Sequence, residues 1–153
     1  MLELNKIIIE DLENIYNRDI DWEKFRNAAV LITGANGLIA TYLIYMFLYL
    51  NEEKDLGVKV IGMARNPEKV EKKFGNLLKR NDFEVIYQDV TEPLQIESSV
   101  DYMIHTASPT GPRQFMSMPV DTIRANVTGT YNLLEAGREK GIKGFLLLST
   151  REI

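Results

Sequence analysis

A short apolar run, residues 28–33 (AAVLIT), leads directly into a junction that contains two glycines, and a second apolar run, residues 37–50, follows. The first run shows no alternation of polar and apolar residues, which is typical of a strand buried on both faces. The second run has the length and character of a buried helix. This combination favours folds in which a parallel sheet lies between layers of helices.

The same order of strand and helix recurs along the chain. Further strands are expected at residues 58–63, 83–88, 100–106 and 144–149. Further helices are expected at residues 66–80 and 119–140, with Gly141 at a helix C-cap position. Apolar residues mark one face of the second of these helices: Val120, Ile123, Val127, Tyr131 and Leu134. We therefore predict an α/β fold with a doubly wound parallel sheet (Rossmann-like) of about five strands, because a closed barrel needs eight such units.

The N-terminal residues differ in pattern from the rest of the chain. Residues 2–17 predict an amphipathic helix, since apolar residues recur near helical spacing. We divide the chain into an N-terminal helical leader, residues 1–27, and a dinucleotide-binding domain, residues 28–153. A length of 153 residues suits a single core of this kind.

Composition excludes several classes of function. The net charge is −4 with acids and bases interspersed, so no nucleic-acid partner is expected. There is no cysteine and a single histidine, His105, which argues against a metal site. The apolar run at 38–50 is about 13 residues long, against roughly 20 for a membrane span. The N-terminus resembles no signal peptide, and we expect a cytoplasmic protein.

The glycine junction predicts a nucleotide site. Gly34 follows the strand and permits a sharp turn, and Gly37 lets a pyrophosphate approach the backbone. Asn36, just before Gly37, is counted among the cofactor-binding residues of this junction. The amides of Leu38 and Ile39 then point at the phosphates from the helix N-terminus, where the helix dipole is positive. A plain tight turn is the alternative interpretation.

The position of a ligand follows from the expected strand order. The first strand lies between the second and the fourth, so the switch point falls between the first and fourth strands. The loop after the fourth strand, residues 107–118, is long for a compact domain, and long loops are often functional. We expect this loop to take part in binding.

Five segments of the chain form a recognisable set: TGANGLIA (33–40), QDVTE (88–92), HTASP (105–109), NVTGTYNLLEAG (126–137) and LLSTREI (147–153). Together they resemble the extended short-chain dehydrogenase/reductase family, in particular its nucleotide-sugar epimerases, dehydratases and decarboxylases. The run "HTASPTGP" followed by "MPVDTIRANVTGT" is most similar to UDP-glucuronate decarboxylases.

The resemblance implies roles for single residues. It assigns Asp89 to the adenine amino group, Val90 to the adenine ring, and Thr150 to catalysis. It places four further residues along or near the cofactor: Thr106, Ala107, Ser108 and Asn126. Simpler alternatives remain, since Asp89 could only terminate a strand and Asn126 could bond only to backbone. His105 is expected to be a hydrogen-bonded histidine at a strand end rather than a catalyst.

The resemblance also implies an activity, in which the bound cofactor accepts and returns a hydride while a nucleotide sugar reacts. In that family a tyrosine transfers the proton and a lysine four positions later lowers its pKa. None of the seven tyrosines here has a lysine at that spacing. We expect the cofactor-binding portion of a longer enzyme, truncated before this pair, inactive by itself, and a homodimer at full length. A complete, non-catalytic nucleotide-binding module is the alternative.

The identity of the cofactor depends on the end of the second strand. NAD-preferring sites carry a carboxylate there, which binds the ribose 2′-hydroxyl. Here Ala64 stands near that position and Arg65 follows, and an arginine suits a 2′-phosphate. Relatives by motif use NAD, and Arg65 could be a solvated surface residue. We expect NAD or NADP, with a modest preference for NADP.

Overall fold

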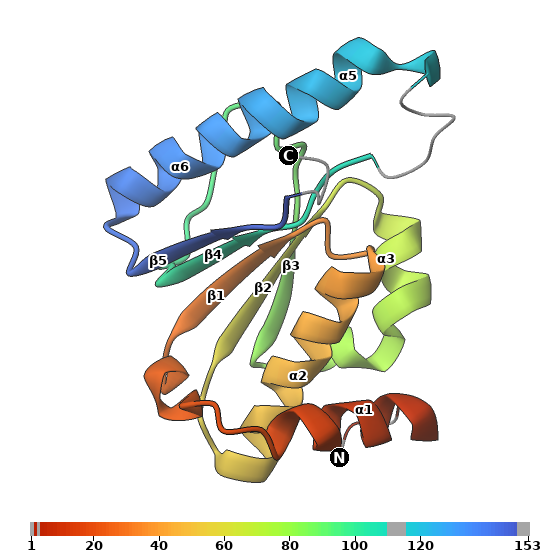
Figure 1. Cartoon of the computed structure of the whole chain (residues 1–153), viewed down its shortest axis with the longest axis vertical. Coiled ribbons are helices and arrows are strands. Elements are labelled where there is room, and N and C mark those ends of the chain that lie inside the picture. The colour runs from red at the N-terminus through yellow and green to blue at the C-terminus, as the bar shows by residue number, and fades with distance from the viewer. Residues whose placement is uncertain (1, 3, 110–115, 150–153) are drawn as a thin grey trace.

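The computed structural model describes residues 2, 4–109 and 116–149 as a five-stranded parallel sheet with helices on both faces (Figure 1). The strand order is β3-β2-β1-β4-β5, which confirms the doubly wound fold and the switch point between β1 and β4. The strands are β1 (Ala29–Thr33), β2 (Lys59–Ala64), β3 (Phe83–Tyr87), β4 (Tyr102–His105) and β5 (Gly144–Leu147).

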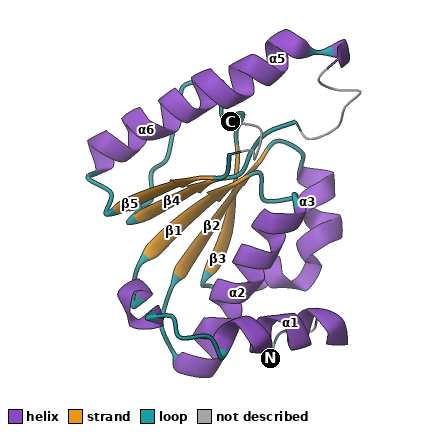
Figure 2. Cartoon of the chain, in the orientation of Figure 1, coloured by secondary structure: helices purple, strands orange, loops and turns teal. Residues whose placement is uncertain are grey.

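The helices form two layers (Figure 2). One face of the sheet is covered by α2 (Leu38–Lys54) and α3 (Pro67–Phe74), and α1 (Lys6–Tyr16) packs against α2 at the base of the domain. The other face is covered by α6 (Gly129–Lys140). A π-helical turn, η3 (Arg124–Thr128), joins α6 to α5 (Pro119–Ile123) in one rod, and α5 extends beyond the carboxyl edge of the sheet. Two 3₁₀ turns, η1 (Trp22–Phe25) and η2 (Gly75–Lys79), are also present.

Strand β1 lies at the centre of two apolar clusters. Val30 and Ile32 pack in the cluster beneath α2, while Ala29 and Leu31 pack in the cluster beneath α6. All five residues of the strand are buried, as the unalternating sequence predicted. Successive side chains of a strand point to opposite faces, so this burial requires a helix layer on each side.

The apolar helix α2 is a core element of the domain. Eight of its residues are buried, among them Ile44, Phe47 and Leu48. Within the described ranges, no helix is long and apolar enough to cross a membrane.

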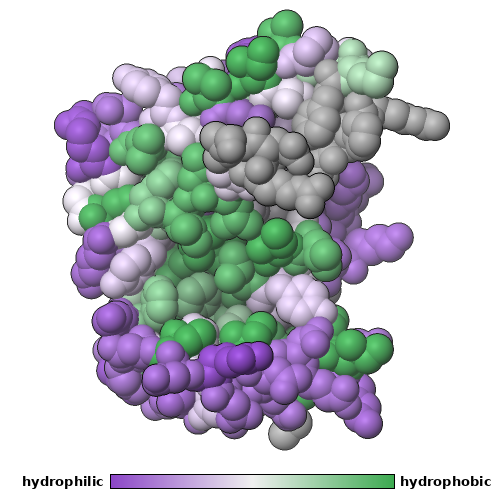
Figure 3. Space-filling model, in the orientation of Figure 1, coloured by the Kyte–Doolittle hydropathy of each residue, from purple (hydrophilic) through white to green (hydrophobic). Residues whose placement is uncertain are grey.

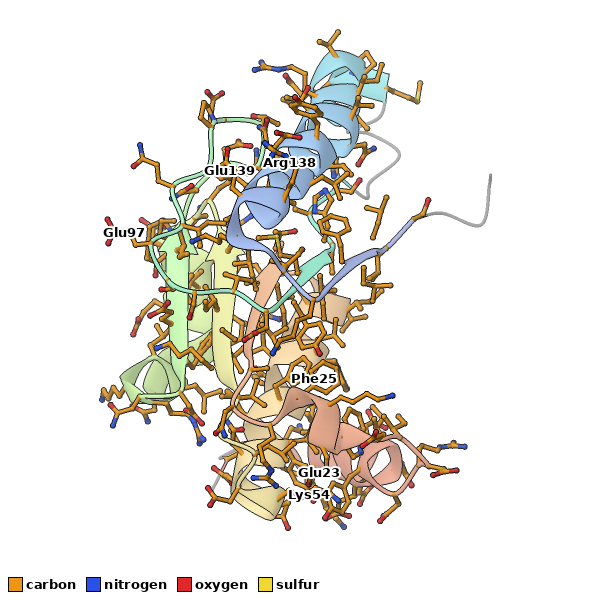
Figure 4. The ribbon with its side chains drawn as sticks, turned by 90° about the vertical axis from the view of Figure 1, so that its left-hand side faces the viewer. Glu23, Phe25, Lys54, Glu97, Arg138 and Glu139 are labelled. Carbon is orange, nitrogen blue, oxygen red and sulfur yellow. The ribbon has the colours of Figure 1, made fainter. Side chains whose placement is uncertain are left out.

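The leader packs against the end of the domain that lies away from the carboxyl ends of the strands (Figure 1). Leu12 of α1 is fully buried in the cluster with α2. Figure 4 shows Phe25 pointing from η1 toward the sheet, where its ring lies 5.1 Å from the rings of both Phe47 and Tyr102. Glu23 and Lys54 lie on the outside of this end. The leader therefore stabilises the base of the sheet.

The structure adjusts the expected ends of several elements. The helix expected at 66–80 stops at Phe74, because Gly75 adopts a positive φ of 44° and the chain continues as 3₁₀ turns. Gly141 has a φ of 64° and caps α6 in the left-handed conformation, as expected. The strands differ from the predicted ranges by one or two residues at an end.

Two apolar surfaces are left uncovered by the described elements. The stripe predicted on the helix at 119–140 is exposed rather than buried, for example Ile123 at 61% and Val127 at 65%. A second surface lies over the β5 side of the sheet, between α6 and the leader (Figure 3). Leu146 and Leu147 of β5 remain about half exposed, at 54% and 45%, and, as consecutive strand residues, point to opposite faces of the sheet. The spacing of apolar residues therefore predicted an apolar face on the helix at 119–140, but it did not predict that this face is exposed to solvent.

Candidate dinucleotide site

Four loops meet at the carboxyl edge of the sheet, because β1 to β4 all run in the same direction. They follow Thr33, Ala64, Tyr87 and His105. The structure thus brings the predicted residues Gly34, Arg65, Asp89 and Thr106 to one edge of the domain (Figure 1).

Gly34 is the point at which two of these loops touch. Its φ of 67° lies in the left-handed region, and a Cβ atom here would lie 2.9 Å from Cα of Ala107 and 3.0 Å from Oγ1 of Thr106. The amide of Gly37 donates to the carbonyl of Gly34 at 2.7 Å and closes the turn. Glycine is therefore required at position 34 both for its backbone conformation and for the space.

The N-terminus of α2 is open toward the same edge. Gly37 is its N-cap residue, with φ of −69° and ψ of 158°, and no side chain caps this helix end. The side chains of Leu38 and Ile39 are 74% and 56% exposed. Free amides at a positive helix end form a ready site for an anion, and the role predicted for Leu38 and Ile39 stays a prediction.

Asn36 carries a polar atom that the fold leaves unsatisfied. Its Oδ1 is buried and has no hydrogen-bond partner among the described residues. A buried acceptor without a donor is costly, so such an atom in a binding loop suggests that a ligand supplies the donor. The side chains and backbone at this turn therefore fit a nucleotide that offers both phosphate and sugar hydroxyl groups.

A hydrogen-bond network around the Thr33 hydroxyl ties β1 to the loop after β4. Oγ1 of Thr33 lies 2.8 Å from Nδ1 of His105 and accepts from the amides of Thr106 and Ala107, each at 3.2 Å. The Thr106 hydroxyl donates to the Thr33 carbonyl at 2.6 Å. With both amides donating to it, the Thr33 hydroxyl donates its own proton to an unprotonated Nδ1. The fixed loop places Thr106 and Ala107 beside the glycine turn.

His105 is buried, with 2% of its surface exposed. Burial lowers the pKa of its imidazole below the usual value, so the ring is neutral at pH 7. This confirms the interpretation of His105 as a hydrogen-bonded histidine at a strand end.

Asp89 is held by groups from two directions. Its Oδ1 accepts from the amide and hydroxyl of Thr91, at 3.0 and 2.9 Å, and its Oδ2 pairs with Nη1 of Arg65 at 3.1 Å. Partial burial opposes ionisation, but the bonds from Thr91 and Arg65 outweigh it and lower the pKa of Asp89. Three donors leave one of the four lone-pair sites of the carboxylate free, on Oδ2, so an adenine amino group remains a feasible fourth donor.

Arg65 belongs to this arrangement rather than standing alone in solvent. Its side chain is 74% exposed, yet its guanidinium is paired with Asp89 across the gap between the loops after β2 and β3. The sequence alone did not predict this pair, because the two residues lie 24 positions apart.

Two residues of α6 position the loop that contains Asp89, and sequence reasoning did not select them. A Cβ atom on Gly129 would lie 2.8 Å from Cγ2 of Val90, so only glycine allows this contact. Nδ2 of Asn132 donates to the carbonyls of Val90 and Glu92, at 2.9 and 3.1 Å. Val90 itself is only 7% exposed, which leaves a small surface for the predicted contact with an adenine ring.

The remaining predicted residues are less closely tied to the edge. Ser108 is exposed and its hydroxyl donates to the carbonyl of Pro109. Asn126 is exposed in η3, and its backbone carbonyl accepts from the Thr130 hydroxyl. Thr150 and residues 110–115 of the long loop lie outside the described residues, so these predictions remain untested.

Comparison with known proteins gives a consistent set of similarities. A family model described as the NAD dependent epimerase/dehydratase family matches residues 30–153. UDP-glucuronic acid decarboxylase 3 of Arabidopsis thaliana is 36% identical over 127 residues, which are 83% of this chain and 35% of that protein. UDP-glucuronic acid decarboxylase 1 of Xenopus tropicalis is 31% identical over 150 residues, or 95% of this chain and 33% of that protein. The chain thus spans about a third of the length of these relatives.

Solved structures share the fold. A UDP-glucose-4-epimerase from Stenotrophomonas maltophila, with bound NAD and formylated UDP-arabinopyranose, aligns with a TM-score of 0.64 at 18% identity, covering 82% of this chain and 38% of that one. A UDP-Glc/GlcNAc 4-epimerase from Campylobacter jejuni aligns with a TM-score of 0.63 at 17% identity, covering 81% and 37%. At these identities the alignments establish the similarity of fold alone.

Substitution at Gly34 tests the contact between the two loops. Gly34→Ala combines a left-handed backbone with a clash against the backbone of Ala107, whereas Gly141→Ala has a similar φ and nothing within 4 Å. We expect Gly141→Ala to lower the free energy of unfolding by about 1–2 kcal/mol, and Gly34→Ala by a further ~1–3 kcal/mol. Urea denaturation measures both, and equal losses would contradict the close approach.

Titration of the single histidine tests the Thr33 network. Because His105 is the only histidine, its NMR signal is unambiguous, and we expect a pKa below the ordinary value of about 6.5. Between the lowered pKa and about 6.5, the unfolded state binds the proton and the folded state does not. The contribution of His105 to the free energy of unfolding is therefore complete above about pH 6.5 and declines as the pH falls. A measured pKa at or above about 6.5 would show that the imidazole is not held neutral.

Proposed function

The chain belongs to the NAD dependent epimerase/dehydratase family, and we propose that it forms the NAD(P)-binding portion of an enzyme that epimerises, dehydrates or decarboxylates a nucleotide sugar. The observation that carries this proposal is the uncapped N-terminus of α2, reached through Gly37 and placed at the switch point of the sheet. Ligands of open α/β sheets bind at this position.

The proposed binding mode uses the residues at the carboxyl edge. Gly37 would leave room for the pyrophosphate, and the amides of Leu38 and Ile39 would donate hydrogen bonds to it. Asp89 would accept from the adenine amino group, and the loop from Thr106 to Ser108 would contact the rest of the dinucleotide. The low pKa of Asp89 supports this role, because it keeps the carboxylate an acceptor at neutral pH.

The nicotinamide, when bound, supplies a hydride acceptor and donor. The residues of this chain would bind and orient it, and the neutral His105 and Thr33 hold the loop after β4 in place. We assign proton transfer in the whole enzyme to residues outside these 153, because the chain lacks a tyrosine with a lysine four positions later. Thr150 remains a proposed catalytic residue on the strength of resemblance.

The substrate and the assembly are further parts of this proposal. Relatives named for UDP-glucuronic acid support a nucleotide-sugar substrate. The exposed apolar stripe of α5 and α6, which includes Val120 and Tyr131, supports a homodimer at full length, because helix faces of this kind are commonly buried at interfaces.

The choice of cofactor is proposed to favour NADP modestly. Ala64 ends β2 where NAD sites carry a carboxylate, so nothing there would repel a 2′-phosphate. Arg65 adds a positive charge beside this position, although Asp89 neutralises part of it. The description of the family as NAD dependent favours NAD instead.

Calorimetric titration of the 153-residue protein with NAD and NADP tests the proposed function. We expect binding of at least one dinucleotide and no turnover of UDP-glucuronate. Gly37→Val should weaken the binding of both dinucleotides by more than about tenfold, because the added side chain blocks the phosphates. The negative φ of Gly37 suits an L-amino acid, but the new Cβ would lie 3.1 Å from the carbonyl oxygen of Gly34, so the fold of the variant has to be measured. Circular dichroism checks the fold of this variant.

Two results would reject the proposal. One is the failure of both dinucleotides to bind the folded wild-type protein. The other is unchanged binding by a folded Gly37→Val variant, which would move the site away from the glycine turn.

A further inference from the structure

A small cavity opens beside the glycine turn, toward α3. It has a volume of about 350 Å³ and is lined by Asn36, Lys69, Lys72 and Lys73. Three of its four lining residues are lysines, so the cavity is strongly positive. It lies between the turn that receives the cofactor phosphates and the helix that follows β2.

The lysines are available to bind an anion. All three are exposed, and among the described residues none of them forms an ion pair with a carboxylate. The nearby Glu68 and Glu71 are on the same helix but do not line the cavity. Without a partner, three ammonium groups in one place repel each other, and an anion between them relieves that repulsion.

Helix α3 is anchored, so the lysines are presented at a defined place. Oδ1 of Asn66 accepts from the amide of Lys69 at 3.0 Å and caps the helix, and Pro67 occupies its first turn. Val70 and Phe74 are buried at 0% and 3% on the opposite face. The apolar side of α3 therefore holds the lysine side against the glycine turn.

Asn36, the fourth residue that lines the cavity, indicates which class of anionic ligand fits it. The buried Oδ1 of Asn36 needs a hydrogen-bond donor, which a fully ionised phosphate does not offer. A ribose that carries a phosphate offers both groups, a hydroxyl for Asn36 and an anion for the lysines. In a dinucleotide this combination occurs at the adenosine ribose of NADP, which lies next to the end of the second strand.

We propose that Lys69, Lys72 and Lys73 bind the 2′-phosphate of NADP, with Asn36 accepting a hydrogen bond from the adjacent ribose hydroxyl. This inference rests on the proposed function, since it extends the same cofactor site. It assigns the discrimination between NADP and NAD to α3 rather than to Arg65, whose guanidinium is already paired with Asp89. The absence of an acidic residue at Ala64 leaves the path to the cavity free of repulsion.

The test is a calorimetric comparison of NADP with NAD and of 2′,5′-ADP with ADP. The wild-type protein should bind each 2′-phosphorylated ligand about tenfold more tightly than its partner, since charge-assisted contacts of this kind are screened but significant. The variant Lys69→Gln/Lys72→Gln/Lys73→Gln should lose this preference and bind NAD as the wild type does.

Two further variants sharpen the comparison. Lys79→Gln is the matched control, because it removes the same charge from η2, where the ammonium bonds to Asn76 outside the cavity. It should leave the preference unchanged. Asn36→Asp places a carboxylate beside the phosphate and should weaken NADP about tenfold more than NAD, even if the triple variant folds poorly.

The results separate this inference from the proposed function. Binding of NAD with no preference for NADP, or a triple variant that weakens both dinucleotides equally, would overturn the inference alone. Competition by inorganic phosphate as strong as that by 2′,5′-ADP would also overturn it, because the cavity would then be a general anion site. If neither dinucleotide binds, the proposed function fails and this inference fails with it.

Discussion

The close approach of two backbone segments, at Gly34 and at Ala107, is the constraint on which the site depends. The glycine permits a positive φ and leaves no atom between the loops after β1 and β4. The hydroxyl of Thr33 holds the second loop by accepting two of its amides. A side chain at position 34 would separate the loops. The loop after β4 would then no longer lie beside the glycine turn that leads to the open helix end at Gly37.

Those parts of the fold that depend on local pattern could be predicted from the sequence. The strand at 28–33 was recognisable because it is an apolar run without alternation, as expected when both faces are buried. Gly141 was recognisable because it follows directly after a helical pattern. The positions of Gly34 and Gly37 followed from the same local reasoning. Element ends were less accurate, since the 3₁₀ turns after Gly75 have no distinct apolar period.

Features that depend on contacts between distant segments could not be predicted. The hydrogen bonds from Asn132 to the loop after β3 join residues about forty positions apart, and nothing in the helix pattern indicates them. The pairing of Arg65 with Asp89 and the lysine cavity beside Asn36 are also products of packing. The apolar face that includes Val120 was predicted from its spacing. Its exposure was not, because exposure depends on which other elements pack against this helix.

The central claim is that a dinucleotide binds across the carboxyl edge between β1 and β4. Amide NMR of ¹⁵N-labelled protein during titration with NAD or NADP tests it most directly. The account predicts that the largest shift changes occur at Gly34, Gly37 to Ile39, Asp89 and Thr106 to Ser108, with little change in α1. Shift changes centred on α1 and the base of the sheet, or spread evenly over the protein, would contradict it.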